Sequence, residues 1–127
     1  MKTSSNKKFN FLDDKRFNDA VNLFNTQSWY PAHDLFEELW HETQSPEREI
    51  LQGILQIAVA RLHLEKGNTK GATILYGEGL ARLKNFLETD LGLDLRQFCE
   101  CLEQSLKLLQ QDSEPEAVSV PCLLKNS

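Results

Sequence analysis

The sequence predicts an all-α fold, a compact antiparallel helical bundle of about five helices. Apolar residues recur at spacings of three and four along most of the chain, which is the period of an amphipathic helix, and no segment shows the alternation typical of a strand. Among the few Gly and Pro residues, Gly67 and Gly92 fall between these segments, where turns belong. Because the connections are short, neighbouring helices are expected to run antiparallel.

The first two helices are expected over about residues 13–25 and 31–42. Asp13 and Asp14 suit the N-terminus of the first, where carboxylates cap free N–H groups and complement the helix dipole. Pro31 suits the first turn of the second, since its missing N–H costs nothing there. Each segment has one apolar stripe, formed by Phe17, Ala20, Val21 and Phe24 in the first and by Leu35, Phe36, Leu39 and Trp40 in the second.

The third helix is expected over about residues 46–66, with Ser45 as its N-cap and Pro46 at its first position. Apolar residues surround it, which predicts the central and most buried helix. Gly67 and Asn68 suit a left-handed C-terminal turn. The fourth helix is expected to extend to about residue 88 with Thr69 as its cap, and the fifth over about residues 95–110 with Asp94 as its cap.

The inner face of the fourth helix contains a glycine among large apolar residues. Its members fall within about 120° of one another at about 100° per residue, and they are Ala72, Leu75, Tyr76, Gly79, Leu80, Leu83, Phe86 and Leu87. Gly79 on this face predicts a close approach of two helices there.

A length of 127 residues allows one domain. We expect a flexible N-terminal segment at 1–12, a single helical domain at 13–110 and a C-terminal tail at 111–127. Periodicity is lost in the tail, although residues 118–124 are apolar enough to dock against the domain.

Composition narrows the setting and the partners. The chain has a net charge of −5 and a pI of about 5.2, with no concentrated basic stripe, so neither nucleic acid nor an anionic membrane is an expected partner. No apolar stretch of signal-peptide type follows the basic start, and the three Cys have no metal or disulfide spacing. We therefore expect a cytoplasmic protein with free thiols, and a homo-oligomer is compatible with its helical surface.

The polar residues that break the apolar pattern are the candidate site. On the second helix, His33, Glu37 and Trp40 are spaced i, i+4 and i+7 and so share one face. On the third, Gln52, Gln56 and His63 lie within about 40° of one another. Buried amides and imidazoles need polar partners. Because the two helices are consecutive, we expect His33 and Glu37 to supply them.

Two interpretations of this cluster stay open. A buried Glu–His–Gln network can simply lock the register of the helices. Alternatively, His33, Glu37 and His63 could hold a divalent transition metal such as zinc or iron, a common role for imidazoles with a carboxylate. Glu37 could instead act as the catalytic general base on a metal-bound water. Gln52 and Gln56 would then orient a polar substrate, and Trp40 would form a wall.

Two motifs resemble those of the DUF309 family of small helical proteins. The first consists of Phe24-Asn25 followed by residues 29–40, against a family pattern of Phe-Asn, an aromatic pair and then His-Glu-x-x-Glu-x-x-Trp. The second consists of residues 52–60, then His63 and residues 67–72. The resemblance extends roughly from Phe17 to Asp94. It departs from the family at Asp34, where Glu is usual, and Asp34 is given no role.

The resemblance implies an all-α bundle of unknown function, and a general label of predicted metal-dependent hydrolase accompanies the family. Carried over by position, its characteristic polar residues are His33, Glu37, Trp40, Gln52, Gln56, His63 and Asn68. Gln52, Gln56, Trp40 and Asn68 would then contact a ligand. Two functions remain as hypotheses: a metal-dependent hydrolase, or a non-catalytic helical interaction module that favours a basic partner and in which the buried polar network is structural.

Overall fold

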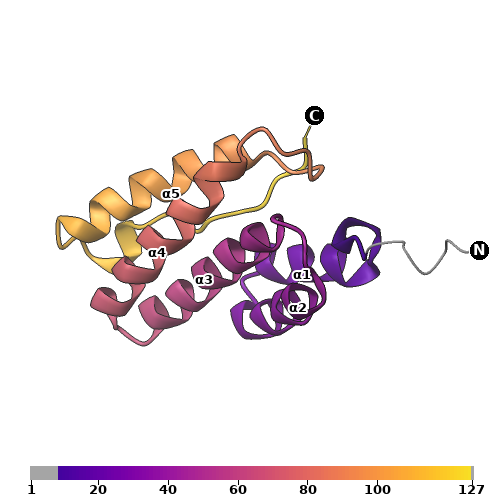
Figure 1. Cartoon of the computed structure of the whole chain (residues 1–127). Coiled ribbons are helices and arrows are strands. Elements are labelled where there is room, and N and C mark those ends of the chain that lie inside the picture. The colour runs from indigo at the N-terminus through magenta and orange to yellow at the C-terminus, as the bar shows by residue number, and fades with distance from the viewer. Residues whose placement is uncertain (1–8, 127) are drawn as a thin grey trace, which may run out of the picture.

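The computed structural model describes residues 9–126 of the chain. Its elements in order are η2 (Phe11–Asp13), α1 (Lys15–Asn25), α2 (Trp29–Glu42), α3 (Arg48–Glu65), α4 (Thr69–Leu83), η3 (Lys84–Phe86), α5 (Leu95–Gln110) and η4 (Pro115–Ala117). Consecutive helices are neighbours, and α3 lies between the α1–α2 pair and the α4–α5 pair (Figure 1). Over the described range the only β-pairing is an isolated antiparallel bridge between Leu93 and Lys125. The prediction of an all-α bundle is confirmed.

The helix boundaries differ from prediction by two residues or more at four ends. Helix α1 begins at Lys15, directly after its Asp14 cap, instead of at about residue 13. Helix α2 begins two residues before Pro31, which still lies in the first turn. Helix α3 begins at Arg48, so Pro46 precedes it in a turn where the N–H of Arg48 donates to the Ser45 carbonyl. Helix α4 ends at Leu83 and continues as the short η3 turn. The apolar pattern continues through these turns, and periodicity alone therefore could not locate the ends.

Polar side chains cap three of the helices. Asp14 accepts from the Arg16 N–H at 2.9 Å, Asn68 from the Gly71 N–H at 3.0 Å, and Asp94 from the Gln97 N–H at 3.0 Å. The cap of α4 is thus Asn68, and the prediction of Thr69 as the cap is wrong, since Thr69 is the first residue of the helix. Gly67 has a φ of 77°, in the left-handed region, as expected after α3.

Helix α3 forms the centre of the core, as predicted. Its buried residues surround the helix and are Ile50, Leu51, Gly53, Ile54, Gln56, Ile57, Ala58, Ala60, Arg61 and Leu64. Aromatic rings join α1, α2 and α5, since the Phe24 ring centroid lies 4.9 Å from that of Trp29 and 5.7 Å from that of Phe98. Burial of each such side chain stabilises the fold by about 1.5–3 kcal/mol.

Two glycines set the distance between α3 and α4. A Cβ atom built on Gly79 would lie 2.9 Å from the carbonyl oxygen of Gly53 and 2.8 Å from Cδ1 of Ile57. A Cβ atom on Gly53 would lie 2.8 Å from Cγ of Leu83. The two backbones therefore approach where neither residue has a side chain, which confirms the close approach predicted from Gly79.

The two terminal segments both contact the domain where they are described. Phe11, within the N-terminal segment expected to be flexible, is buried, while residues 1–8 lie outside the described range. At the other end Val118, Pro121 and Leu123 are buried, so the apolar part of the tail docks. Asn25 anchors it, donating to the Leu123 carbonyl at 2.9 Å and accepting from its N–H at 2.7 Å. Figure 1 shows this segment in yellow, running back across the helices.

None of the described helices combines the length and apolar character needed to cross a bilayer.

Candidate functional site

The predicted residues of α2 lie at the protein surface. His33 is half-buried, with Nδ1 3.2 Å from Oδ1 of the neighbouring Asp34, and its ring centroid lies 6.4 Å from that of Tyr30. Glu37 is exposed and forms no ion pair within residues 9–126. This face of α2 therefore opens toward solvent instead of meeting the polar residues of α3.

Trp40 is covered by the first residue of α3. The guanidinium carbon of Arg48 lies 4.0 Å from the centre of the indole ring, and Nη2 of Arg48 donates to the Trp40 carbonyl at 3.4 Å. A cation over an aromatic face is held by the ring quadrupole. Trp40 thus packs at the α2–α3 junction. This is a structural position, which a residue forming the wall of a substrate site would not need.

Gln56 has its partners on α4. Its Nε2 donates to Oε1 of Glu78 at 3.0 Å, and its Oε1 accepts from Nε of Arg82 at 3.0 Å. Arg82 also donates through Nη1 to Glu49 on α3. The expectation that His33 and Glu37 would satisfy Gln56 is wrong. The glycine crossing brings α4 against this side of α3, and the amide is satisfied there.

The other predicted residues lie apart from this network. Gln52 is half-buried and forms no side-chain hydrogen bond among residues 9–126. Nδ1 of His63 lies 3.1 Å from Nδ2 of Asn68, and Oδ1 of Asn68 caps α4. Both ends of the Asn68 amide are therefore engaged in holding the α3–α4 turn, and His63 contributes to the same turn.

The geometry does not fit the expected metal site. Over the described part of the chain, no group of three or more His, Cys, Asp or Glu side chains lies close enough to hold an ion. His33, Glu37 and His63 consequently do not form a ligand set, because α2 turns the first two outward while His63 lies at the far end of α3. No catalytic step is derived through a metal at these residues.

Sequence reasoning missed the residues that do meet Gln56. Glu49, Glu78 and Arg82 were not among the predicted site residues, yet they border an open hollow of about 350 Å³ together with Ala81 and Asn85. A signal was present, since Glu49 and Gln56 are seven apart on α3 and Glu78 and Arg82 are four apart on α4. The sequence alone does not indicate that these faces of α3 and α4 meet.

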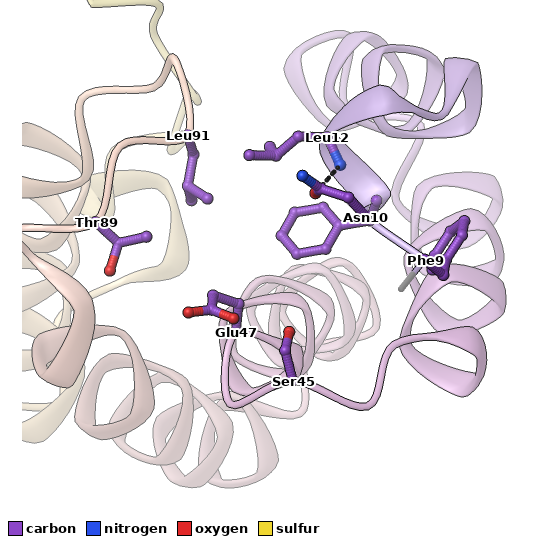
Figure 2. Close-up of a pocket in the computed structure, with 8 residues that line it drawn as sticks. Phe9, Asn10, Leu12, Ser45, Glu47, Thr89 and Leu91 are labelled. Atoms are coloured by element: carbon purple, nitrogen blue, oxygen red, sulfur yellow. Dashed lines mark hydrogen bonds between the residues drawn. The ribbon is translucent and has the colours of Figure 1, made fainter. Parts of the chain in front are cut away.

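A second pocket, of about 410 Å³, lies at the same end of the bundle, beside the start of α3 (Figure 2). Residues 9–12, Ser45 and Glu47, and Thr89 and Leu91 line it. Glu47 is its one charged lining residue, and Figure 2 shows that side chain between Ser45 and Thr89. None of the predicted site residues lines this pocket.

Arg16 links the end of α2 to α1. Its guanidinium contacts Asp14 at 2.9 Å, Glu42 at 2.7 Å and Glu38 at 3.3 Å. The hydrogen bonds from Arg16 lower the pKa of Asp14 from 3.8 to about 2, and the same guanidinium lowers the pKa of Glu42. The acidic surface of α2 therefore has one end, at Glu38 and Glu42, that is paired with an arginine.

All three cysteines are free thiols, and the most buried of them, Cys99, has low reactivity. Burial, with a smaller contribution from Glu103, raises the pKa of Cys99 to about 11, which keeps this thiol protonated at neutral pH. Cys101 and Cys122 are also free thiols and are half-buried.

Comparison with known proteins identifies relatives without assigning an activity. The chain is 27% identical over 104 residues to the uncharacterized protein YpuF of Bacillus subtilis (strain 168), covering 80% of this chain and 60% of that one. It is 24% identical over 99 residues to an uncharacterized protein of Aquifex aeolicus (strain VF5), covering 77% and 30%. The chain therefore spans less than two thirds of either relative. No solved structure matches it.

The family match coincides with the first half of the fold. Residues 17–75 match the model of the domain of unknown function DUF309. This region runs from α1 into α4 and contains all seven polar residues of the predicted site, whereas residues 76–94, where resemblance was also expected, lie outside the match. The resemblance seen in the two motifs is thus confirmed, since residues 17–75 of this chain match the DUF309 family model.

Proposed function

We propose that this chain is a non-catalytic helical interaction module, in which the outer face of α2 receives a basic segment of a protein partner. The observation that carries the proposal is the charge of α2. Between Trp29 and Glu42 this helix has four carboxylates, on Asp34, Glu37, Glu38 and Glu42, and no Lys or Arg.

Among residues 9–126, half of this acidic face has no Lys or Arg partner. Arg16 pairs with Glu38 and Glu42, whereas Asp34 contacts only His33 and Glu37 forms no ion pair. Next to the free carboxylates, Tyr30 is 65% exposed, which is unusual for so large a ring. An exposed aromatic ring beside carboxylates suits a Lys or Arg side chain, which can pair with the acid and lie on the ring.

The closed α3–α4 network supports a structural role for the buried polar residues. Each polar end of the Gln56 amide is bonded within the network, and Arg82 bonds both Gln56 and Glu49. Groups satisfied by one another fix register and leave little hydrogen-bonding capacity for a substrate. The partial coverage of longer relatives also suits a module used within larger proteins.

We also propose a cytoplasmic location and a protein as the partner. The three free cysteines favour a reducing cytoplasm. The net charge of −5 disfavours nucleic acid and anionic membrane as partners, and a second copy of the chain would meet like charge on the α2 face.

A capture experiment with matched variants tests the proposal. Tag-free protein is immobilised and exposed to lysate of its own cells, and bound proteins are quantified by mass spectrometry. We expect the Asp34→Arg/Glu37→Arg variant to lose a partner that the wild type retains, and Glu100→Arg, on the exposed side of α5, to keep it. Capture should weaken as salt is raised.

Two results would contradict the module. One is equal capture of every protein by the wild type and the α2 variant. The other is a stoichiometric transition metal in protein purified without a tag, together with a higher melting temperature on adding Zn, Mn, Fe or Ni, which would favour the metal-dependent hydrolase.

A further inference from the structure

The pocket beside the start of α3 has three oxygen-bearing side chains in its lining that no described group binds. Ser45, Glu47 and Thr89 are all half-buried. Among residues 9–126, none of these side chains forms a hydrogen bond, and Glu47 forms no ion pair. The two hydroxyls and the carboxylate therefore have unused hydrogen-bonding capacity at the edge of a hollow of about 410 Å³.

The neighbours of Glu47 in the sequence do not occupy its carboxylate. Glu47 directly precedes α3, but its side chain makes no capping hydrogen bond to the helix. The adjacent Arg48 has its guanidinium carbon 4.0 Å from the centre of the Trp40 ring. Arg82, in turn, pairs with Glu49. The nearby arginines are thus engaged elsewhere, which leaves the carboxylate of Glu47 available to a ligand.

The other side of the hollow is apolar. Phe11 and Leu91 are buried, whereas Phe9 and Leu12 are 37% and 38% exposed. Figure 2 shows Leu12 and Leu91 across the hollow from Glu47. Apolar walls with a few polar groups, in a space of about 300–1,000 Å³, are typical of pockets that bind small molecules.

The lining excludes an anionic ligand. No Lys, Arg or His belongs to the described lining, so an anion would meet Glu47 without a compensating positive charge. The remaining polar side chain, Asn10, is already used, because its Oδ1 accepts from the Leu12 N–H at 3.0 Å (Figure 2). Charge complementarity at this pocket therefore favours a cation.

We propose that this pocket binds a small primary amine with an aromatic or aliphatic body. An ammonium group has three N–H donors and no acceptor, which complements Ser45, Glu47 and Thr89. The contact with Glu47 is charge-assisted and hence the strongest of the three. The apolar body displaces water from Leu12 and Leu91. This site is separate from the acidic face of α2 and does not depend on the function proposed there.

The pocket is completed by segments outside the family match. Within residues 17–75 its lining has only Ser45 and Glu47, whereas residues 9–12 and Thr89 and Leu91 lie beyond either end of the match. The amine site is accordingly proposed for this chain and not for the region that it shares with DUF309.

Nuclear magnetic resonance of the full chain tests the site. In ¹H–¹⁵N spectra at pH 7, we expect the backbone N–H signals of Leu12, Glu47 and Leu91 to shift saturably as phenethylamine hydrochloride replaces sodium chloride at constant ionic strength. A dissociation constant of about 1 mM or below is expected, as for a weak but specific site. The signal of Glu100, which is exposed on α5, should stay in place.

A ligand series on the wild-type chain separates the charge, the N–H donors and the apolar body. The alcohol 2-phenylethanol keeps the body without the charge, and phenethyltrimethylammonium keeps the charge without N–H donors. Both should bind about tenfold or more weakly than phenethylamine, because charge-assisted hydrogen bonds are lost. Methylamine should also bind about tenfold or more weakly, because little apolar area is buried.

Matched variants assign the two sides of the pocket. Glu47→Gln should weaken phenethylamine binding about tenfold or more, whereas Glu100→Gln, which changes an exposed carboxylate on α5, should leave it unchanged. Leu12→Ser should weaken binding about threefold or more, because apolar contact is lost. Its control is Ile74→Ser, since Ile74 is 53% exposed on α4, away from the pocket.

The proposal fails if phenethylamine causes no saturable shift, or if Glu100 shifts as much as the pocket signals. Equal binding of phenethylamine and its trimethylammonium analogue, or equal binding to wild type and Glu47→Gln, would also contradict it. The ligand series uses the wild-type chain, so it still decides if a variant does not fold.

Two other occupants have their own outcomes in this experiment. Tighter binding of Nα-acetyl-lysine amide than of phenethylamine would assign the pocket to a lysine of a partner protein. Lys7 and Lys8 precede Phe9 in the sequence, outside the described range. Amine binding that appears only in the Lys7→Gln/Lys8→Gln variant would assign the pocket to these lysines. Either result would overturn the proposed amine site.

Discussion

The α3–α4 interface and the outer face of α2 have the same sequence pattern, but their polar side chains have opposite environments. Each presents polar residues at helical spacing beside an apolar stripe. Between α3 and α4 the polar groups meet one another across the glycine crossing, through Gln56, Glu78 and Arg82. On α2 the corresponding groups, His33 and Glu37, face outward.

The difference lies in the neighbouring helix. A polar side chain beside a close backbone crossing is forced into contact with groups on the partner helix and must be satisfied there. A polar side chain on a face that no helix covers is satisfied by water. The first arrangement fixes structure, whereas the second leaves a surface free for a partner.

Filling the glycine crossing is expected to have the largest effect on stability. Gly79→Ala would place a methyl group 2.9 Å from the Gly53 carbonyl oxygen, which cannot rotate away because it belongs to the backbone of α3. We expect the free energy of unfolding to fall by about 1–3 kcal/mol, measured by urea denaturation.

The matched control lies two residues away on the same helix. A Cβ atom on Gly77 would meet nothing within 4 Å. Gly77→Ala should therefore raise the free energy of unfolding by up to about 1 kcal/mol, because alanine favours the helix. Equal effects of the two substitutions would show that the crossing is not tight.

Removing Gln56 should have the next largest effect. Gln56→Ala deletes a buried amide and leaves Glu78 and Arg82 without that partner, so we expect a loss of about 1–2 kcal/mol in urea denaturation. Gln52→Ala, on the same helix but without a side-chain hydrogen bond in the described range, should cost less than about 0.5 kcal/mol. If Gln52→Ala cost as much as Gln56→Ala, the closed network would not be the cause.

Acid should weaken the ion pair between Asp14 and Arg16. The pKa of Asp14 is about 2 in the folded chain against an ordinary 3.8, so its ion pair with Arg16 stabilises the fold above pH 3.8 and is lost as the pH falls toward about 2. The acid limb of thermal stability, followed by circular dichroism, should therefore be shallower in Asp14→Asn than in the wild type.

The neighbouring carboxylate serves as the control for this titration. Asp13 is exposed and forms no ion pair among residues 9–126, so Asp13→Asn should retain the wild-type slope between pH 2 and 3.8. A wild-type slope in Asp14→Asn would contradict the role given to the Arg16 cluster.

The smallest effect on stability is expected at the open half of the α2 face. Glu37→Arg changes an exposed, unpaired carboxylate and should alter the free energy of unfolding by no more than about 0.5 kcal/mol. A loss above about 1 kcal/mol in urea denaturation would show that Glu37 is a structural residue after all. A small effect combined with lost partner capture would separate binding from stability.

Local chemistry made much of the fold predictable. The caps Asp14 and Asp94, the left-handed Gly67 and the burial of α3 follow from residue type and periodicity, which act within a few residues of the chain. The site was less predictable. Gln56 was correctly singled out as a buried amide, but its partners were wrong, since they depend on which faces of α3 and α4 meet.

The sequence by itself determined five helical segments, a central apolar helix, a close approach at Gly79 and the match of residues 17–75 to the DUF309 model. Only the tertiary structure decided that Gln56 pairs with α4, that His33 and Glu37 face solvent, and that Glu47 lines a pocket together with apolar side chains. The reason is physical. Helix formation depends on neighbours three and four residues away, whereas a buried polar group is satisfied by whichever distant segment the packing brings beside it.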